Sequence, residues 1–303
     1  MTVGIVVPTF NREQLLPITI AAVRAQTLHN WRLVLVDDGS ADGTVDVARQ
    51  AARSDPRIHV VMQSHGGIAA ARNCGMEHLD DAELVIFLDD DDLWERDTLQ
   101  RLSAALERDT RAVGAYGLAR AIDLNGQPLR NDALMERQTR RRGTRGAGLI
   151  EWPASEPTTF EVMAFGNVIM TPGTVLIRRS ALGHAGRFRE PAADWNMWLR
   201  LTMQGHLVFL PEVVIGYRSH PGNESRSILR NSRRKLLVHW RLLWSADLTR
   251  SQRRAAWLGF VYYYADLSRS GRTLRRLLGR SARGGPAPGT PPTRRSRSAR
   301  WRR

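Results

Sequence analysis

Apolar and polar positions follow two different periods along the first 110 residues. Runs that are apolar at consecutive positions and rich in β-branched side chains are typical of strands buried on both faces of a parallel sheet. Such runs occur at Val3–Pro8, Arg32–Val36, His59–Met62 and Leu84–Leu88. The segments between them repeat apolar residues at a spacing near 3.6, which predicts helices. These segments are Glu13–Gln26, Asp42–Ser54, Ile68–His78 and Asp97–Glu107.

This alternation of strands and helices predicts an open, doubly wound, mostly parallel α/β sheet. A sheet of that kind binds its ligand beyond the carboxyl ends of its strands. Four loops should meet there: Thr9–Arg12, Asp37–Gly43, Ser64–Arg72 and Asp89–Trp94. We therefore expect the chemistry of the protein in these loops.

The pattern loosens after a further predicted strand at Ala112–Leu118. Residues 130–172 have no clean periodicity, which predicts a long loop, and long loops inside compact domains are usually functional or mobile. Its basic residues are Arg137, Arg140, Arg141, Arg142 and Arg145. Regular structure is expected again at Thr174–Ile177, Trp195–Gln204, Leu207–Leu210 and Val213–Tyr217.

The chain is predicted to divide into three parts. Residues 1–225 form one domain with halves 1–118 and 119–225, and residues 226–268 form a helical extension with helices at Leu229–Ala246 and Gln252–Ser268. Residues 269–303 contain 12 arginines, no acidic residue and the run GGPAPGTPP, a composition that cannot bury a core. We expect this Arg-rich tail to be disordered.

The formal net charge of +15 comes from one end of the chain. Residues 1–225 hold 24 basic and 28 acidic residues, whereas residues 226–303 hold 21 basic and 2 acidic residues. Only the C-terminal quarter therefore has the charge to hold a phosphate polymer or an anionic bilayer. The single cysteine, Cys74, and an N-terminal run that reads as a strand favour a cytoplasmic protein, with peripheral contact to the inner face of a membrane through the basic C-terminus.

The segment VIFLDDDDLW, residues 85–94, runs from a buried strand into four aspartates. Neighbouring carboxylates raise one another's pKa, and a hard divalent cation with oxygen ligands would stabilise them. A solvated acidic turn is the alternative.

Three other loops carry polar groups suited to a nucleotide. LVLVDDGSADGT places Asp38 after a buried strand, where a carboxylate can accept from a base or a ribose hydroxyl, or can belong to an ordinary turn. VVPTFNR offers Thr9, Asn11 and Arg12, and HGGIAAARNCG offers Arg72, whose fork of donors suits a diphosphate. Turn-forming, capping and solvated roles are the alternatives for these residues.

In order and spacing, these four motifs resemble the family 2 glycosyltransferases, inverting enzymes with a GT-A-like fold. The resemblance covers residues 3–220 and implies a nucleotide-sugar site, a metal motif, a catalytic base and a hydroxyl acceptor. The implied nucleotide-sugar residues are Pro8, Thr9, Asn11, Arg12, Asp38, Arg72, Asp89 and Asp90. The implied ligands of Mg²⁺ or Mn²⁺ are Asp91, Asp89 and His220, although four adjacent aspartates leave the register open to Asp90 and Asp92.

The family places its base in a segment that reads here as PAADWNMWLRL, residues 191–201. Asp194 aligns with the base, while Ala193 replaces the usual Glu. The alternative role for Asp194 is the N-cap of a helix that starts at Trp195.

The resemblance implies transfer of a sugar from a nucleoside diphosphate to an acceptor hydroxyl, with residues 119–225 forming the acceptor half. The rival interpretation is a non-enzymatic binder of nucleic acid or acidic polymer that acts through the Arg-rich tail. Intact metal-type aspartates together with Asp194 favour the enzyme, so nucleic acid is not an expected partner.

Overall fold

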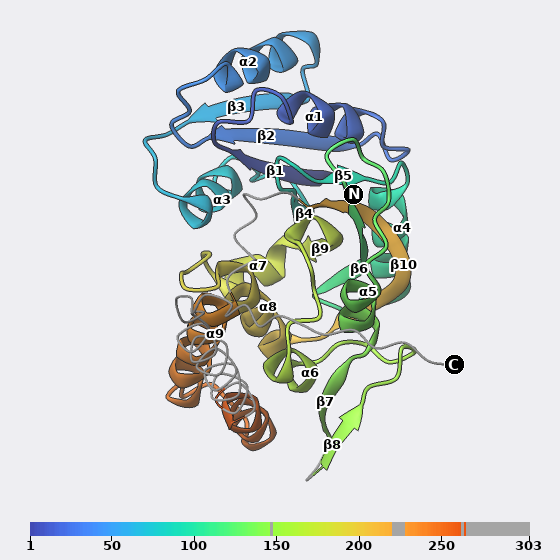
Figure 1. Ribbon diagram of the computed structural model, residues 1–303, viewed down its shortest axis with the longest axis vertical. Helices are drawn as coiled ribbons and strands as arrows, with labels where there is room; N and C mark the ends of the chain where they lie inside the picture. The colour runs from blue at the N-terminus through green and yellow to red at the C-terminus, as the bar shows by residue number, and fades with distance from the viewer. Residues whose placement is uncertain (146–147, 220–227, 262–263, 265–303) are drawn as a thin grey trace, which may run out of the picture.

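The computed structural model describes residues 1–145, 148–219, 228–261 and 264 (Figure 1). The first part of the chain alternates strands and helices as predicted. The elements are β1 (Val3–Thr9), α1 (Leu16–Arg24), β2 (Trp31–Asp37), α2 (Thr44–Ser54), β3 (Ile58–Met62), α3 (Ile68–Met76), β4 (Leu84–Phe87), β5 (Leu93–Trp94) and α4 (Thr98–Arg108). The two-residue strand β5 was not predicted.

The second part of the chain completes the sheet and adds helices. Its elements are β6 (Gly114–Ile122), α5 (Asp132–Thr139), β7 (Arg142–Arg145), β8 (Gly148–Glu151), α6 (Phe160–Phe165), β9 (Val175–Arg178), α7 (Arg179–Ala185), α8 (Ala193–Gln204), β10 (Leu207–Arg218) and α9 (Ile228–Leu243). A further helical stretch spans residues 250–261.

Within the described residues, the main sheet has eight strands in the order β3-β2-β1-β4-β9-β6-β10-β5. The pairs β1–β2, β2–β3, β1–β4 and β6–β10 are parallel, whereas β9 and β5 run antiparallel to their neighbours. The predicted mostly parallel α/β sheet is therefore confirmed. Because β9 lies between β4 and β6, the two predicted halves of the domain share one sheet.

Period-two alternation along β1 divides the core into two layers. Val3, Ile5 and Val7 are fully buried beneath α1, α2 and α4, whereas Val6 packs into the layer on the other face, with α3, α6, α7 and α8. Buried strands of this kind need apolar residues at every position, which explains the continuous apolar runs in the sequence.

The prediction of a long loop over residues 130–172 is wrong. The segment contains α5, the β7–β8 hairpin and α6. Arg141 is buried there: its guanidinium lies 4.6 Å from the centroid of the Phe209 ring and donates to the carbonyl oxygens of Pro153 and Glu156. Elements this short leave little periodicity in the sequence. A buried arginine counts as a polar position, so the pattern predicts an exposed residue there.

The last strand also differs from the prediction. Leu207–Leu210 and Val213–Tyr217 belong to one strand, β10, whose register with β6 shifts between Phe209 and Val213. Pro211 in this stretch has no backbone N–H, which is typical of such an irregularity.

The predicted helical extension is present from α9 to residue 261 and packs on the main domain. Nε2 of His239 lies 2.6 Å from the carbonyl oxygen of Ala164, and its ring contacts Trp195. Val238, Ala255 and Ala256 are buried in the same core layer as α6 and α8. The boundary at residue 225, His220 and the Arg-rich tail lie outside the described residues, so those predictions stay predictions.

Candidate active site

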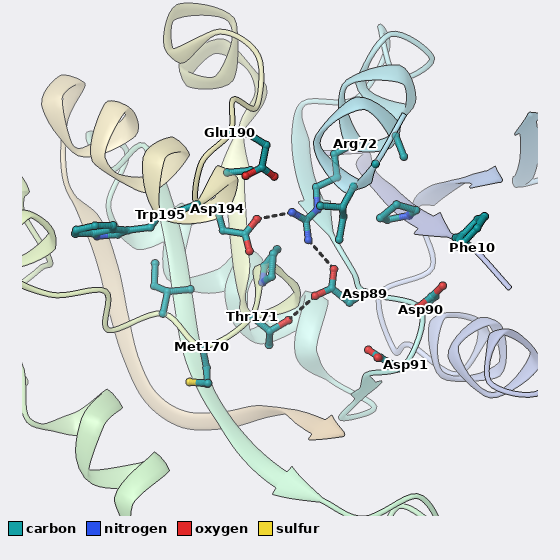
Figure 2. Close-up of a pocket in the computed structure, with 18 of the residues that line it drawn as sticks. Phe10, Arg72, Asp89, Asp90, Asp91, Met170, Thr171, Glu190, Asp194 and Trp195 are labelled. Atoms are coloured by element: carbon teal, nitrogen blue, oxygen red, sulfur yellow. Dashed lines mark hydrogen bonds and ion pairs between the residues drawn. The ribbon is translucent and has the colours of Figure 1, made fainter. Parts of the chain in front are cut away.

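A pocket of about 600 Å³ opens beyond the carboxyl ends of β1, β2 and β4 (Figure 2). The four loops selected from the sequence all contribute to it, and α8 closes one side. Most of the predicted site residues line it: Pro8, Thr9, Arg12, Asp38, Arg72, Asp89, Asp90, Asp91 and Asp194. The expectation that these loops converge is therefore met in the structure.

Arg72 joins Asp89 of the predicted metal motif to Asp194, the predicted base. It is fully buried on α3, and it donates from Nη2 to Oδ1 of Asp89 at 2.7 Å and from Nη1 to Oδ1 of Asp194 (Figure 2). Burial alone would lower the pKa of Arg72, but the two carboxylates raise it above its ordinary value. Two of its donors are thus occupied by carboxylates. Contact between Arg72 and a diphosphate stays a prediction.

Asp194 lies in the first turn of α8 and does not cap it. The helix begins at Ala193, and the side chain of the N-cap residue Ala192 makes no capping bond. Burial raises the pKa of Asp194, the charges of Asp89 and Glu190 raise it further, and Arg72 opposes the shift. Arg72 contacts one oxygen of Asp194, and Figure 2 shows the other oxygen pointing away from Arg72. Asp194 therefore lies at the pocket with an elevated pKa, and its role as the general base stays a prediction.

The four consecutive aspartates have different environments. Asp92 is buried away from the pocket, where it accepts from the Thr171 hydroxyl at 2.7 Å and from the Arg218 N–H at 3.1 Å. Its burial beside Asp91 raises its pKa well above the ordinary value. Asp92 thus anchors the loop to β10, whereas Asp89, Asp90 and Asp91 line the pocket. Which of the aspartates hold a metal stays a prediction.

Asp90 and Asp91 lie against a basic side chain of the first loop. Nε of Arg12 is 3.3 Å from Oδ1 of Asp90, and Nη2 of Arg12 is 4.0 Å from Oδ2 of Asp91. Burial and the charge of Asp91 raise the pKa of Asp90 to about 7, although Arg12 opposes the shift. Burial and the neighbouring Asp91 thus disfavour a negative charge on Asp90.

The donor chemistry fits a hard divalent cation. Asp89 and Asp91 offer carboxylate oxygens to the same pocket, and Mg²⁺ typically binds one or two protein carboxylates together with substrate phosphates. The described residues contain no group of three His, Cys, Asp or Glu side chains able to hold a metal ion. A site here would therefore depend on phosphate oxygens for its remaining ligands.

Asp38 organises the third loop. Its carboxylate accepts from the backbone N–H groups of Gly66 and Gly67, both at 2.8 Å, and from Nε2 of Gln63 at 2.6 Å. Gly67 has φ of +84°, a conformation that L side chains rarely adopt. Glycine at this position thus allows the loop to close on Asp38 at the pocket wall.

Two predicted residues are placed differently. Asn11 does not line the pocket: its Oδ1 accepts from the Ala41 N–H at 2.9 Å, and its own N–H donates to the Ser40 hydroxyl. Asn11 therefore joins two loops, and its contact with the nucleotide stays a prediction. His220 lies outside the described residues, so its role as a metal ligand stays a prediction.

Sequence reasoning missed several pocket residues. Phe10 is 40% exposed, and its ring centroid lies 4.4 Å from that of His65 beside Asp38. Thr171 lies within hydrogen-bond distance of Asp92 and Asp89, and Glu190 lies near Asp194. Phe10 could have been found inside VVPTFNR, but Thr171 and Glu190 have no local signal.

The comparisons identify the family of this fold and site. The chain matches the family described as Glycosyl transferase family 2 over residues 4–185, which is more than half of its length. The chain belongs to glycosyl transferase family 2. The resemblance inferred from the four motifs is thus confirmed.

Relatives of this family 2 chain include TuaG of Bacillus subtilis (strain 168), a glycosyltransferase provisionally assigned to teichuronic acid biosynthesis. The two are 37% identical over 108 residues, which is 35% of this chain and 42% of TuaG. The chain thus spans less than half of the length of this curated relative.

Solved structures share the fold. Staphylococcus aureus TarS 1–349 in complex with UDP-GlcNAc superposes with a TM-score of 0.66 at 17% identity, covering 89% of this chain and 74% of that chain. The mannosyltransferase PcManGT of Pyrobaculum calidifontis, in complex with GDP-Man and Mn²⁺, gives a TM-score of 0.60 at 18% identity. The match covers 92% of this chain and 79% of that chain. The GT-A-like fold of this family 2 chain is therefore confirmed.

Proposed function

We propose that this protein is an inverting glycosyltransferase that moves a sugar from a nucleoside diphosphate to an acceptor hydroxyl. The observation that carries the proposal is the link through Arg72, which holds Asp89 and Asp194 at the wall of one pocket. An inverting displacement needs groups for the leaving diphosphate and a base for the incoming hydroxyl, on opposite sides of the anomeric carbon. We assign the leaving-group side to Asp89 and the base side to Asp194.

The donor nucleotide belongs at the end of the pocket formed by β1 and β2. Phe10 and His65 present an aromatic surface that a base can cover, and Pro8, Thr9 and Asp38 adjoin it. Stacking on aromatic rings is a general way to hold a base. The UDP-GlcNAc bound to TarS and the GDP-Man bound to PcManGT support a nucleotide-sugar as the donor.

Asp89 and Asp91 would hold Mg²⁺ or Mn²⁺, with phosphate oxygens of the donor as further ligands. The cation would supply Lewis-acid stabilisation of the departing nucleoside diphosphate. Arg12 lies beside Asp91 and adds positive charge on the same side. The Mn²⁺ in the PcManGT complex supports this assignment.

Asp194 would accept the proton of the acceptor hydroxyl while the hydroxyl oxygen attacks the anomeric carbon. Its elevated pKa makes it a stronger base than an exposed carboxylate, and Arg72 fixes its orientation. Reaction in one displacement forms no covalent sugar–enzyme bond and inverts the anomeric configuration.

The acceptor belongs at the opposite end of the pocket, where the lining comes from the second half of the chain. Met170 and Tyr217 provide apolar and aromatic surface, and Arg137, Arg234 and Lys235 provide positive charge. This lining suits a sugar acceptor that carries an anionic group. A panel of paired neutral and phosphate-bearing acceptors would identify the class.

The function is tested by hydrolysis and transfer assays with a panel of sugar nucleotides and Mn²⁺. Asp194→Asn should keep its affinity for the donor in calorimetry and lose at least about a hundredfold in turnover, as is typical for a missing general base. Asp46→Asn, an exposed change on α2, is the matched control and should keep wild-type turnover. Normal turnover by Asp194→Asn would contradict the base, and salt-sensitive DNA binding without turnover would favour the rival binder.

A further inference from the structure

The helices that follow the main sheet present large apolar side chains to solvent. Trp240, Trp244 and Trp257 are 50%, 74% and 53% exposed. Together with three other exposed residues they form what we call the aromatic face. Its members are Leu237, Trp240, Trp244, Trp257, Val261 and Tyr264. A contiguous exposed apolar surface usually marks an interaction site.

Helical spacing places these residues in two stripes. Leu237, Trp240 and Trp244 follow each other at intervals of three and four on α9 and the residue after it. Trp257 and Val261 are four positions apart on the next helical stretch, and Tyr264 follows three positions later. The Phe260 ring links the stripes, 6.2 Å from the Trp240 centroid and 5.8 Å from the Trp257 centroid. The two helices therefore present a joint surface on the flank that also carries α8 (Figure 1).

Packing on the main domain uses the other side of the helices. Gly259 lies so close to α6 that an added Cβ would approach the Ala164 carbonyl oxygen to 2.2 Å and His239 Nε2 to 2.4 Å. Val238, His239 and Ala255 are buried at this contact. The aromatic face is thus directed away from the domain core.

Positive charge surrounds the aromatic face. Residues 228–261 contain eight basic residues and one acidic residue, Asp247. Helical spacing places Arg233 on the stripe of Trp240, and Arg250 and Arg254 on the stripe of Trp257. Aromatic rings and basic side chains on one helical surface are the features of helices that lie in the interface of an anionic bilayer.

We propose that the aromatic face docks on an anionic lipid bilayer, with the indole rings in the interface and the surrounding arginines on lipid phosphates. A negatively charged surface complements this charge, and a neutral surface does not. Because α9 also lines the catalytic pocket through Arg234 and Lys235, the docked membrane lies beside the pocket. Docking is a separate property from transfer, so it can be tested without a known acceptor.

The test is co-sedimentation of the full chain with phosphatidylcholine vesicles, with and without phosphatidylglycerol, at low and high salt. The protein should pellet only with vesicles that contain phosphatidylglycerol, and high salt should weaken the association. Trp240→Ser/Trp244→Ser/Trp257→Ser should lower the partition coefficient at least about tenfold, because less apolar surface enters the interface. Arg233→Glu/Arg250→Glu should lower it by a similar factor.

The matched control is Leu124→Ser/Leu149→Ser, which removes exposed apolar side chains outside the two helices and should pellet like the wild type. Tryptophan quenching by brominated lipid, strong in the wild type and reduced in the triple Trp variant, checks that the rings enter the interface. Three outcomes overturn the proposal: no phosphatidylglycerol-dependent pelleting, unchanged pelleting of the triple variant, or conversion of a dimer to a monomer by that variant. If added DNA prevents the pelleting of the wild type and of the triple Trp variant equally, the binding belongs to the Arg-rich tail instead.

Discussion

At the scale of single residues, the charge beside Asp194 should control the pH range in which this proposed base can act. Glu190 is one of the groups that raise the pKa of Asp194. A base works only when deprotonated, so kcat/KM should fall as the pH falls through the pKa of Asp194. We predict that Glu190→Gln moves this acidic limb to lower pH, because it removes a negative charge that favours the protonated acid.

The pH profile of kcat/KM measures the effect of Glu190→Gln, with Glu107→Gln, an exposed change on α4, as the control. The control should leave the limb in place. A limb that stays in place in Glu190→Gln, or moves to higher pH, would contradict the assignment of that limb to Asp194.

The aspartates of the β4–β5 loop allow a second prediction at this scale. Asp91→Asn should lower Mn²⁺-dependent turnover at least about a hundredfold, since a catalytic cation supplies several kcal/mol of charge stabilisation. Its melting temperature should stay equal or rise, because the change removes one of several mutually repelling carboxylates. Asp97→Asn, at the start of α4, is the control. Wild-type turnover in EDTA would exclude the metal role.

At the scale of elements, one glycine positions α3 and thereby Arg72. Gly75 lies one turn after Arg72, and an added Cβ would stand 2.4 Å from Cγ1 of Val6 on β1. α3 can therefore approach the sheet closely only with glycine at this position. The approach brings the Arg72 guanidinium to Asp89 and Asp194.

Gly75→Ala should destabilise the protein by about 1–3 kcal/mol, as overpacked core positions do, and should lower turnover by shifting Arg72. Gly183→Ala is the matched control, because Gly183 is also in a helix and no atom lies within 4 Å of its added Cβ. The control should be neutral or slightly more stable, since alanine favours helix over glycine. Denaturant unfolding and the turnover assay measure both changes. Equal stabilities for the two variants would show that the close approach of α3 does not matter.

At the scale of the whole molecule, the charged C-terminus is expected to be independent of the catalytic fold. Among the described residues, no helix is long and apolar enough to cross a membrane. Residues 280–303 contain eight arginines and a Pro/Gly-rich run, a composition that buries little surface. Removal of these residues should leave the melting temperature and transfer to a water-soluble acceptor unchanged. A clear drop in melting temperature in calorimetry would show that the segment packs on the domain.

The sequence by itself determined the α/β sheet, the four loops and the chemical types in the pocket. Parallel buried strands require consecutive apolar residues, and their carboxyl ends must lie at one edge of the sheet, so local patterns predict both features. Pro8, Thr9, Asp38 and Asp89 could be selected on that basis.

Only the tertiary structure decided which groups meet and which are exposed. Arg72 and Asp194 are 122 positions apart, and their contact depends on how α3 and α8 pack against the sheet. Packing also buried Asp92 while it left Asp91 in the pocket, and it exposed Trp240 where an apolar pattern suggests burial. Local patterns record the period of each element and not the distances between elements, and those distances determine burial, pKa and contact.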